Sequence, residues 1–191
     1  MIEKGADVNA QGGQHGNALQ AALYRGNEAI AKLLIEKGAD INAQGGYYGN
    51  ALYAASYKGN EVIVRLLIEK GADVNAQGGE HGNALYAALD KGNEAIAKLL
   101  IEKGADINAQ ERYHGNALHV ASVRGHKAIA KLLIEKGADV NAQGGQYGNA
   151  LQAASIKGHE ALAELLIEKG ADANIIALSD TPWSSDSDDS F

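Results

Sequence analysis

The chain has 191 residues, a formal net charge of −7 and no cysteine, so disulfides and thiolate metal sites are excluded. Asp180, Asp186, Asp188 and Asp189 near the C-terminus supply four of the negative charges, which leaves −7 + 4 = −3 for the rest and no basic face that would suit nucleic acid. No apolar run approaches the roughly 20 residues that cross a bilayer, and the first residues lack a signal-peptide pattern. We therefore expect a cytoplasmic or nuclear protein that binds neither nucleic acid nor membrane.

The phrase Glu-Lys-Gly-Ala-Asp recurs six times, and each copy follows the last by 33 residues. Its glycines are Gly5, Gly38, Gly71, Gly104, Gly137 and Gly170. A fixed period of this length predicts a stacked array of small units rather than one globular core. The expected units are a partial repeat at 1–13, full repeats at 14–46, 47–79, 80–112, 113–145 and 146–178, and a tail at 179–191.

Each unit predicts two short helices and a glycine-tipped connection, as residues 47–79 illustrate. Asn50 is placed to cap a first helix that ends at Gly59, and Asn60 precedes an amphipathic second helix that ends at Gly71. The segment from residue 72 to residue 79 then reverses the chain before the next unit. Helices of about ten residues are marginal in water, so we expect neighbouring units to cover their apolar faces. One unit alone is expected not to fold.

The two ends of the array differ from its interior. Ile30 and Leu33 match the apolar residues of interior units, so the first unit has no polar outer face. Either an upstream repeat is missing, or this exposed end docks on another molecule such as a second copy. At the other end, residues 175–178 are apolar and are expected to form a makeshift cap. The tail at 179–191 has a disordered composition, and its Trp183 and Phe191 either dock on a repeat or a partner or are incidental.

The 33-residue unit, which closes with Gly-Ala-Asp-Val-Asn-Ala, resembles the ankyrin repeat family over residues 1 to about 174. This resemblance implies an all-α solenoid of helix–turn–helix units with hairpin-like connections. The family usually opens its first helix with Thr-Pro-Leu-His, whereas here the segments read Asn-Ala-Leu followed by Gln20, Tyr53, Tyr86, His119 or Gln152. We therefore expect the inter-repeat hydrogen bonding of the Thr–His pair to be lost. The sequence from Gly144 to Ser155 also resembles ankyrin arrays of filamentous fungi. Such arrays often form the sensing end of larger nucleotide-binding immune-type receptors.

Comparison of the units with one another separates packing positions from variable ones. Leucine columns barely change, whereas the hairpin tips and both ends of the first helix vary and hold all eight tyrosines. Tyrosine gives a large contact area at low entropic cost, and the resemblance implies that these positions line a concave groove. The candidate partner-binding residues are Gln14, His15, Tyr24, Tyr47, Tyr48, Tyr53, Tyr57, Glu80, His81, Tyr86, Asp90, Arg112, Tyr113, His114, His119, Gln146 and Tyr147. The alternative is that the tyrosines stack to stiffen the array, which for Tyr53 and Tyr86 is at least as strong an interpretation.

No constellation in the sequence predicts catalysis, a metal or a cofactor. The glycine pairs are not followed by the lysine of a phosphate-binding loop, and His15, His81 and His114 lack further ligands at suitable spacing. His126 and His159 stand where other units have asparagine, so helix capping or inter-repeat hydrogen bonding explains them. The sequence thus favours a non-catalytic scaffold that binds a protein or peptide. The alternative is a structural spacer or self-associating array, or the sensor segment of a larger receptor.

Overall fold

The computed structural model describes residues 7–78, 82–111 and 114–173, and the expected cap and tail lie outside these ranges. Within them the chain is all-α, with ten helices in five pairs and only two isolated β-bridges in place of strands. The first helices of the pairs are α1 (Ala18–Tyr24), α3 (Ala51–Lys58), α5 (Ala84–Asp90), α7 (Ala117–Arg124) and α9 (Ala150–Ile156). The second helices are α2 (Glu28–Glu36), α4 (Glu61–Glu69), α6 (Glu94–Glu102), α8 (Lys127–Glu135) and α10 (Glu160–Glu168). Each predicted full repeat contains one pair.

The helix ends follow the predicted capping residues. The side-chain oxygen of Asn50 accepts a hydrogen bond from the backbone N–H of Tyr53, and the equivalent asparagine caps every other first helix. Asn60 caps α4 in the same way through the N–H of Ile63. Gly59 ends α3 with φ of 74°, in the left-handed region where only glycine is free of strain. The predicted starts and stops of both helices in this unit are confirmed.

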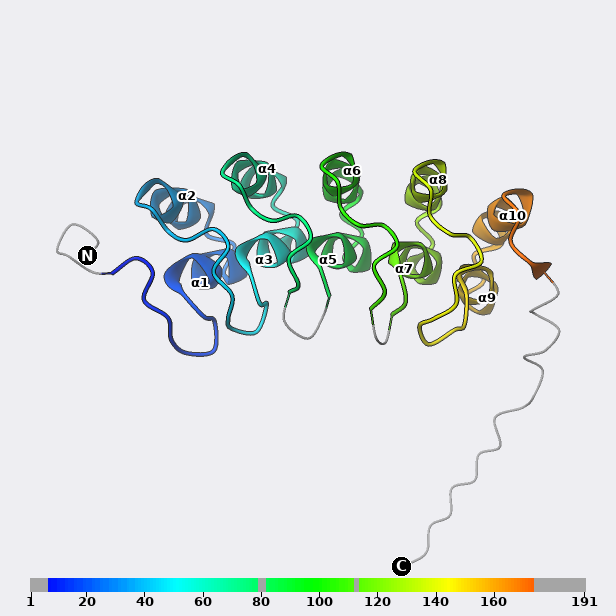
Figure 1. Cartoon of the computed structure of the whole chain (residues 1–191), viewed down its shortest axis with the longest axis horizontal. Helices are drawn as coiled ribbons and strands as arrows, with labels where there is room; N and C mark the ends of the chain where they lie inside the picture. The colour runs from blue at the N-terminus through cyan, green and yellow to red at the C-terminus, as the bar shows by residue number, and fades with distance from the viewer. Residues whose placement is uncertain (1–6, 79–81, 112–113, 174–191) are drawn as a thin grey trace, which may run out of the picture.

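The helices form two layers. Figure 1 shows α1, α3, α5, α7 and α9 side by side in an inner layer, with the second helix of each pair in an outer layer above it and the hairpins below. Inner helices pack more closely on one another than outer helices do. Alanines at the contact, such as Ala54 and Ala55 with no exposed surface, allow this close approach. The result is an arched array whose inner face carries the variable positions.

A continuous hydrophobic core runs between the two layers and from one repeat to the next. Ile63, Leu67 and Leu100 have no exposed surface, and they belong to one cluster that extends from Leu19 to Ala171. No helix pair contains a closed core of its own, because each apolar face is covered by the adjacent pair. This is the arrangement that the short, amphipathic helices predict.

The recurring Gly-Ala-Asp-x-Asn phrase forms a hydrogen-bonded ladder along the array. The side chain of Asn42 donates to the carbonyl oxygen of Gly71 at 3.0 Å and accepts from the backbone N–H of Asp73 at 2.9 Å. Asn9, Asn75, Asn108 and Asn141 repeat the same pair of bonds to the next glycine and aspartate. Each of the first five copies of the phrase therefore ties its unit to the following one, which gives a physical reason for the constancy of the phrase.

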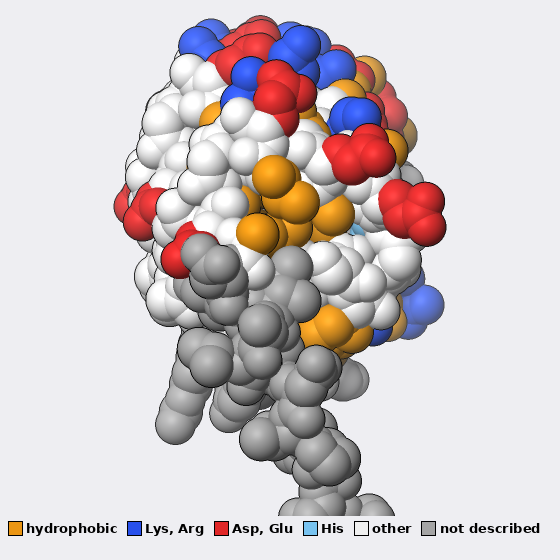
Figure 2. All heavy atoms as spheres, turned by 90° about the vertical axis from the view of Figure 1, so that its right-hand side faces the viewer, with side chains coloured by type: hydrophobic (Ala, Val, Ile, Leu, Met, Phe, Trp, Pro, Cys, Tyr) orange, Lys and Arg blue, Asp and Glu red, His pale blue; other side chains and the backbone are white. Residues whose placement is uncertain are grey.

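Both ends of the array expose apolar side chains. Ile30 and Leu33 on α2 are 47% and 43% exposed, whereas Ile63 at the position equivalent to Ile30 is fully buried. Figure 2 shows hydrophobic side chains at the surface of the C-terminal end, where Ile156 and Ile167 of the last pair are also exposed. Among the described helices, none has the length and apolar character needed to cross a membrane.

Candidate functional site

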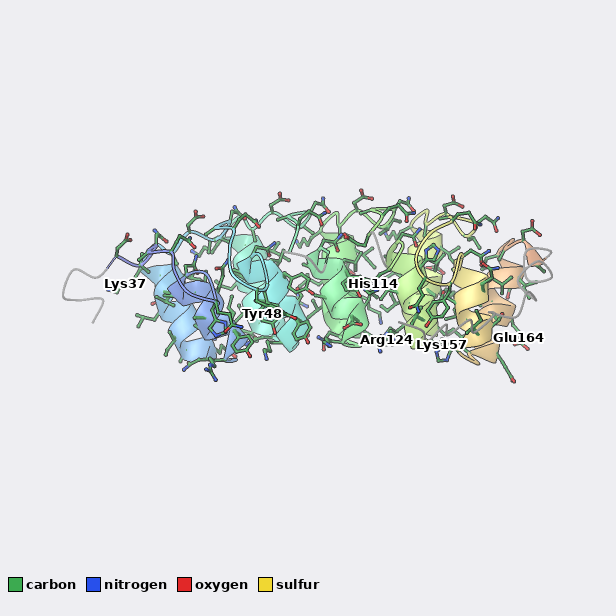
Figure 3. The ribbon with its side chains drawn as sticks, turned by 90° about the horizontal axis from the view of Figure 1, so that it is seen from below. Lys37, Tyr48, His114, Arg124, Lys157 and Glu164 are labelled. Carbon is green, nitrogen blue, oxygen red and sulfur yellow. The ribbon has the colours of Figure 1, made fainter. Side chains whose placement is uncertain are left out.

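The candidate site is the inner face, which the first helices and the hairpins build together. Seen from below in Figure 3, Tyr48, His114, Arg124 and Lys157 lie along this face, from the second repeat to the fifth. Each hairpin is closed at its base by a backbone bond between equivalent residues, such as the N–H of Gly45 to the carbonyl of Gly49 at 2.7 Å. The tips that the structure describes, at residues 14–15, 47–48 and 146–147, therefore lie beside the inner helices.

A tyrosine cluster fills the inner face in the first two repeats. Tyr48 lies at its centre, with ring centroids 5.5 Å from Tyr24, 5.8 Å from Tyr53 and 5.1 Å from Tyr57. The ring of Tyr47 meets Tyr48 edge-on at 5.1 Å. Burial raises the pKa of Tyr48, and the side chain of Tyr53 is only 2% exposed. In this half of the face the tyrosines pack on one another, as the stacking alternative predicts.

Cations cover the outer surface of this tyrosine cluster. The ammonium of Lys58 lies 4.9 Å from the ring centroid of Tyr24, and that of Lys91 lies 4.4 Å from the centroid of Tyr57. At such distances a cation is attracted to the face of an aromatic ring. The tyrosine cluster of the first two repeats is therefore closely packed, and its outer surface carries these cations.

A pocket replaces the tyrosine cluster in the last three repeats. At the far end of the first helix, the column that reads Tyr24 and Tyr57 in the first two repeats continues as Asp90, Val123 and Ile156. Because the large rings are absent, a cavity of about 250 Å³ opens between α5, α7, α9 and the last hairpin. Tyr86, Val120, Val123, Tyr147 and Ala153 form its apolar lining.

Charged groups surround the mouth of this pocket. Asp90 pairs with Arg124 of the next repeat and with Lys91 at 3.0 Å. Burial opposes ionisation of Asp90, but the hydrogen bonds from these two cations outweigh it and lower its pKa. Lys157 lies over the ring of Tyr147 at 5.1 Å, and both residues line the pocket. Among the residues that line the pocket, Arg124 and Lys157 are cations and Asp90 is an anion, so the formal charge is +2 − 1 = +1.

Tyr86 forms a wall of the pocket and is held by its neighbours. Its ring lies 4.7 Å from that of His114 on the hairpin tip. Burial, and then the nearby charge of Asp90, raise the pKa of Tyr86 to about 12, so its hydroxyl stays protonated at neutral pH. The wall therefore offers an aromatic face and a hydrogen-bonding group but no charge.

The structure divides the candidate residues by exposure. Gln14, Tyr47, His114 and Gln146 are exposed, and His15, Tyr24, Tyr57, Tyr86, Asp90 and Tyr147 are half-buried. Tyr48, Tyr53 and His119 are buried, so they support the face rather than present a side chain to a partner. Glu80, His81, Arg112 and Tyr113 lie outside the described residues.

His119 lines the pocket and forms a capping box with Asn116. Its backbone N–H is bonded to Asn116, and its Nε2 donates to the carbonyl of Gly148 in the next hairpin at 3.3 Å. Gln20 bonds in the same way to Asn17 and to the carbonyl of Gly49 at 3.0 Å. The expected loss of inter-repeat hydrogen bonding is therefore wrong at these positions, because Asn–Gln and Asn–His pairs replace the Thr–His pair.

Several residues of the pocket were not among the candidates. Val120, Val123, Arg124, Ala153 and Lys157 line it, but small apolar residues and a uniform basic column give a weak sequence signal. The one available signal was the change from tyrosine to smaller residues along a single column. His126 and His159 stand at the N-cap positions of α8 and α10, but their side chains do not bond to the helix ends. Their Nε2 atoms donate instead to the carbonyls of Leu89 and Val123 in the preceding repeat, which is the inter-repeat alternative. Among the described residues, no group of three or more His, Asp and Glu is placed to hold a metal.

Comparison with known families agrees with this architecture. A model described as ankyrin repeats (3 copies) matches residues 44–111 and 86–177, and one described as ankyrin repeats (many copies) matches residues 1–35. A search of curated proteins gave no match. Ankyrin repeats are typically protein–protein interaction modules. Since the three-copy model covers more than half of the sequence and the helix pairs stack as such repeats do, the chain belongs to the ankyrin repeat family.

Proposed function

We propose that this chain is a non-catalytic module that binds a protein or peptide through its inner face, with the pocket in the last three repeats as the anchor site. The observation that carries the proposal is the pocket itself, a cavity of about 250 Å³ with aromatic walls and a charged mouth. Binding energy in interfaces concentrates where a large side chain enters such a desolvated pocket. The tyrosine cluster of the first two repeats, with the cations on its outer surface, then supplies further surface beside the anchor.

The composition of the face supports the same proposal. Tyrosine and arginine are the residues that most often dominate binding energy, and here Tyr86, Tyr147 and Arg124 converge on one cavity. Arg124 is also held in place by Asp90 of the preceding repeat. A side chain that is already ordered loses less entropy when a partner binds. The pocket is therefore pre-organised as well as shaped.

Self-association is the second candidate function, and one observation favours it. Ile30 and Leu33 expose apolar surface at the first repeat, where the equivalent residues of other repeats are covered. Contact between such ends would extend the array. Light scattering over a range of concentrations tests this candidate: association that Leu33→Lys abolishes supports it, and a constant molar mass contradicts it.

Selection of peptides from a displayed library on the full chain tests the primary proposal. Val123→Tyr restores the ring found at this position in the first two repeats and fills the pocket, and Ile156→Tyr is its matched control in the same column, outside the pocket. Selected peptides are expected to bind Val123→Tyr at least about tenfold more weakly, which corresponds to about 1.4 kcal/mol. Ile156→Tyr is expected to bind them as the unchanged chain does. Peptides that lose affinity only with Lys98→Glu, on an outer helix, would contradict the proposal.

A further inference from the structure

The pocket lies near the point where the chain leaves the described residues. It is built by α5, α7, α9 and the last hairpin, and the described part of the chain ends at Ala173, just after α10. The segment that follows contains Trp183, which is the one tryptophan of the sequence, together with four aspartates between positions 180 and 189. An acidic segment that contains two large aromatic side chains, Trp183 and Phe191, therefore begins near a positively charged pocket.

The size of the pocket suits a single large side chain. Its volume of about 250 Å³ lies below the roughly 300–1,000 Å³ of sites that hold drug-sized ligands. Tyr86 and Tyr147 provide aromatic walls, and the buried side chains of Val120 and Ala153 provide apolar surface. Aromatic rings in such contacts gain from offset or edge-on packing as well as from burial. An indole ring matches this lining, and its N–H can donate to the carboxylate of Asp90 at the mouth.

The charges of the two parts are opposite. The pocket lining carries the cations Arg124 and Lys157 against the single carboxylate of Asp90. The tail carries four aspartates and no cation: Asp180, Asp186, Asp188 and Asp189. Arg124 and Lys157 remain largely accessible to a second carboxylate, since Arg124 is 48% exposed and Lys157 is also exposed. Electrostatic complementarity of this kind favours one partner over others and fixes its register.

The length of the intervening chain allows the contact. Trp183 stands ten positions after Ala173, and ten extended residues span at most about 33–36 Å. Neighbouring repeats are about 8–10 Å apart. The pocket is built by the first helices of the last three repeats, so it lies at most two repeat steps from the last repeat and is within reach. The first repeat, about 40 Å away by the same spacing, is beyond the reach of Trp183.

We propose that the segment Ser179–Phe191 folds back onto the inner face and places the side chain of Trp183 in this pocket, with its aspartates beside Arg124 and Lys157. The chain then carries its own ligand for the site, and a partner binds by displacing it. This inference rests on the proposed function, because it assigns an occupant to the same pocket. A tethered ligand acts at an effective concentration that reaches the millimolar range for short flexible linkers. A peptide partner must therefore bind the pocket tightly enough to displace the tethered segment.

Fluorescence of the full chain tests the inference directly, because Trp183 is the only tryptophan. Excitation at the red edge of the absorption band selects it from the eight tyrosines. With an undocked state populated at roughly 10%, the acrylamide quenching constant is expected to fall roughly tenfold below that of N-acetyltryptophanamide. The emission maximum is expected to shift to the blue, and the protection to weaken as added salt screens the aspartates.

Two pairs of variants locate the tryptophan. Val123→Tyr and Lys157→Glu are expected to restore quenching to that of the free indole. Their matched controls, Ile156→Tyr in the same column and Arg25→Glu in the same basic column of the first repeat, are expected to leave the protection unchanged. Circular dichroism confirms that each variant keeps its helices, and Val123→Tyr uses a residue that the fold already accepts at this column.

Three results would overturn the inference. The first is that Trp183 of the unchanged chain is quenched as readily as the free indole. The second is that both pocket variants protect Trp183 as well as the unchanged chain does, which places the indole elsewhere. The third is that the protection disappears on dilution, which assigns it to a second copy. None of these decides the proposed function, since an empty pocket remains open to a peptide. Loss of the proposed function would show instead as selected peptides that bind Val123→Tyr and Ile156→Tyr equally.

Discussion

The side-chain amide of Gln20 donates a hydrogen bond to the carbonyl oxygen of Gly49, which lies 29 residues further along the chain, at 3.0 Å. The same side chain accepts the backbone N–H of Asn17 at 2.9 Å, so one buried residue closes its own helix and holds the next hairpin. His119 makes the equivalent pair of contacts to Asn116 and Gly148. A single position in the first helix thus couples neighbouring repeats.

Replacement of Gln20 by alanine tests this coupling. Gln20→Ala leaves the N–H of Asn17 and the carbonyl of Gly49 without their partner in a buried setting, and unpaired buried groups cost about 1–3 kcal/mol. We expect the free energy of unfolding in urea to fall by that amount. Gln20→His is the control, because histidine makes the same contacts in the fourth repeat. Equal losses for both variants would show that the hydrogen bonds are not the cause.

His119 is expected to make stability depend on pH. Burial lowers its pKa, and the hydrogen bond to Gly148 only partly offsets this effect. In the unfolded chain the pKa returns to about 6.5. Below that pH the unfolded state takes up a proton that the folded state resists, so stability is full above about pH 6.5 and is lost as the pH falls. The loss approaches about 1.4 kcal/mol per pH unit between the two pKa values.

His119→Gln provides the comparison for this pH effect, since glutamine occupies the same position in the first and fifth repeats. Urea unfolding of both proteins between pH 5 and pH 8, about the range in which histidine titrates, gives the difference in slope. The variant is expected to lose less stability below pH 6.5, the approximate pKa of free histidine. Parallel pH curves for the two proteins would rule out His119 as the titrating group.

The fold was predictable because its determinants are local and repeated. Capping asparagines such as Asn50, stop glycines such as Gly59 and the 33-residue interval each act within a few residues, and the structure follows them. The Asn ladder was not foreseen. Asn42 bonds to Gly71 in the next unit, and the sequence shows only that both residues recur.

The pocket was harder to predict, because it arises from what is missing. Its presence depends on Val123 standing where Tyr24 and Tyr57 stand in the first two repeats, and on three helices approaching the same point. Tyrosines are often binding residues, but Tyr48 and Tyr53 are buried and pack on their neighbours. The residues that open the site are small, and their effect appears only in three dimensions.

Ile30 and Ile63 occupy the same position in successive repeats and differ in exposure, 47% against none. Ile63→Ala empties a fully covered site and is expected to cost about 2–5 kcal/mol. Ile30→Ala removes a side chain that is already half in water, so about 1 kcal/mol or less is expected. Urea unfolding of both variants measures the difference. If the two losses were equal, the covering of each repeat by its predecessor would not be the main source of stability.

A peptide of residues 47–79 tests whether a repeat has any independent stability. Within the array, Asn42 and Gly104 of the neighbouring repeats bond to this unit, and its buried residues Ile63 and Leu67 belong to the shared core. The isolated unit loses these hydrogen bonds and the shared core. It keeps only two short helices, and isolated helices shorter than about 12–15 residues are marginally stable in water. Circular dichroism is therefore expected to show little helix and no cooperative melting, whereas a fragment of three consecutive units is expected to fold, because about three repeats are needed for stability. Cooperative melting of the single unit would mean that local interactions suffice, and stacking would then be a consequence of folding rather than its cause.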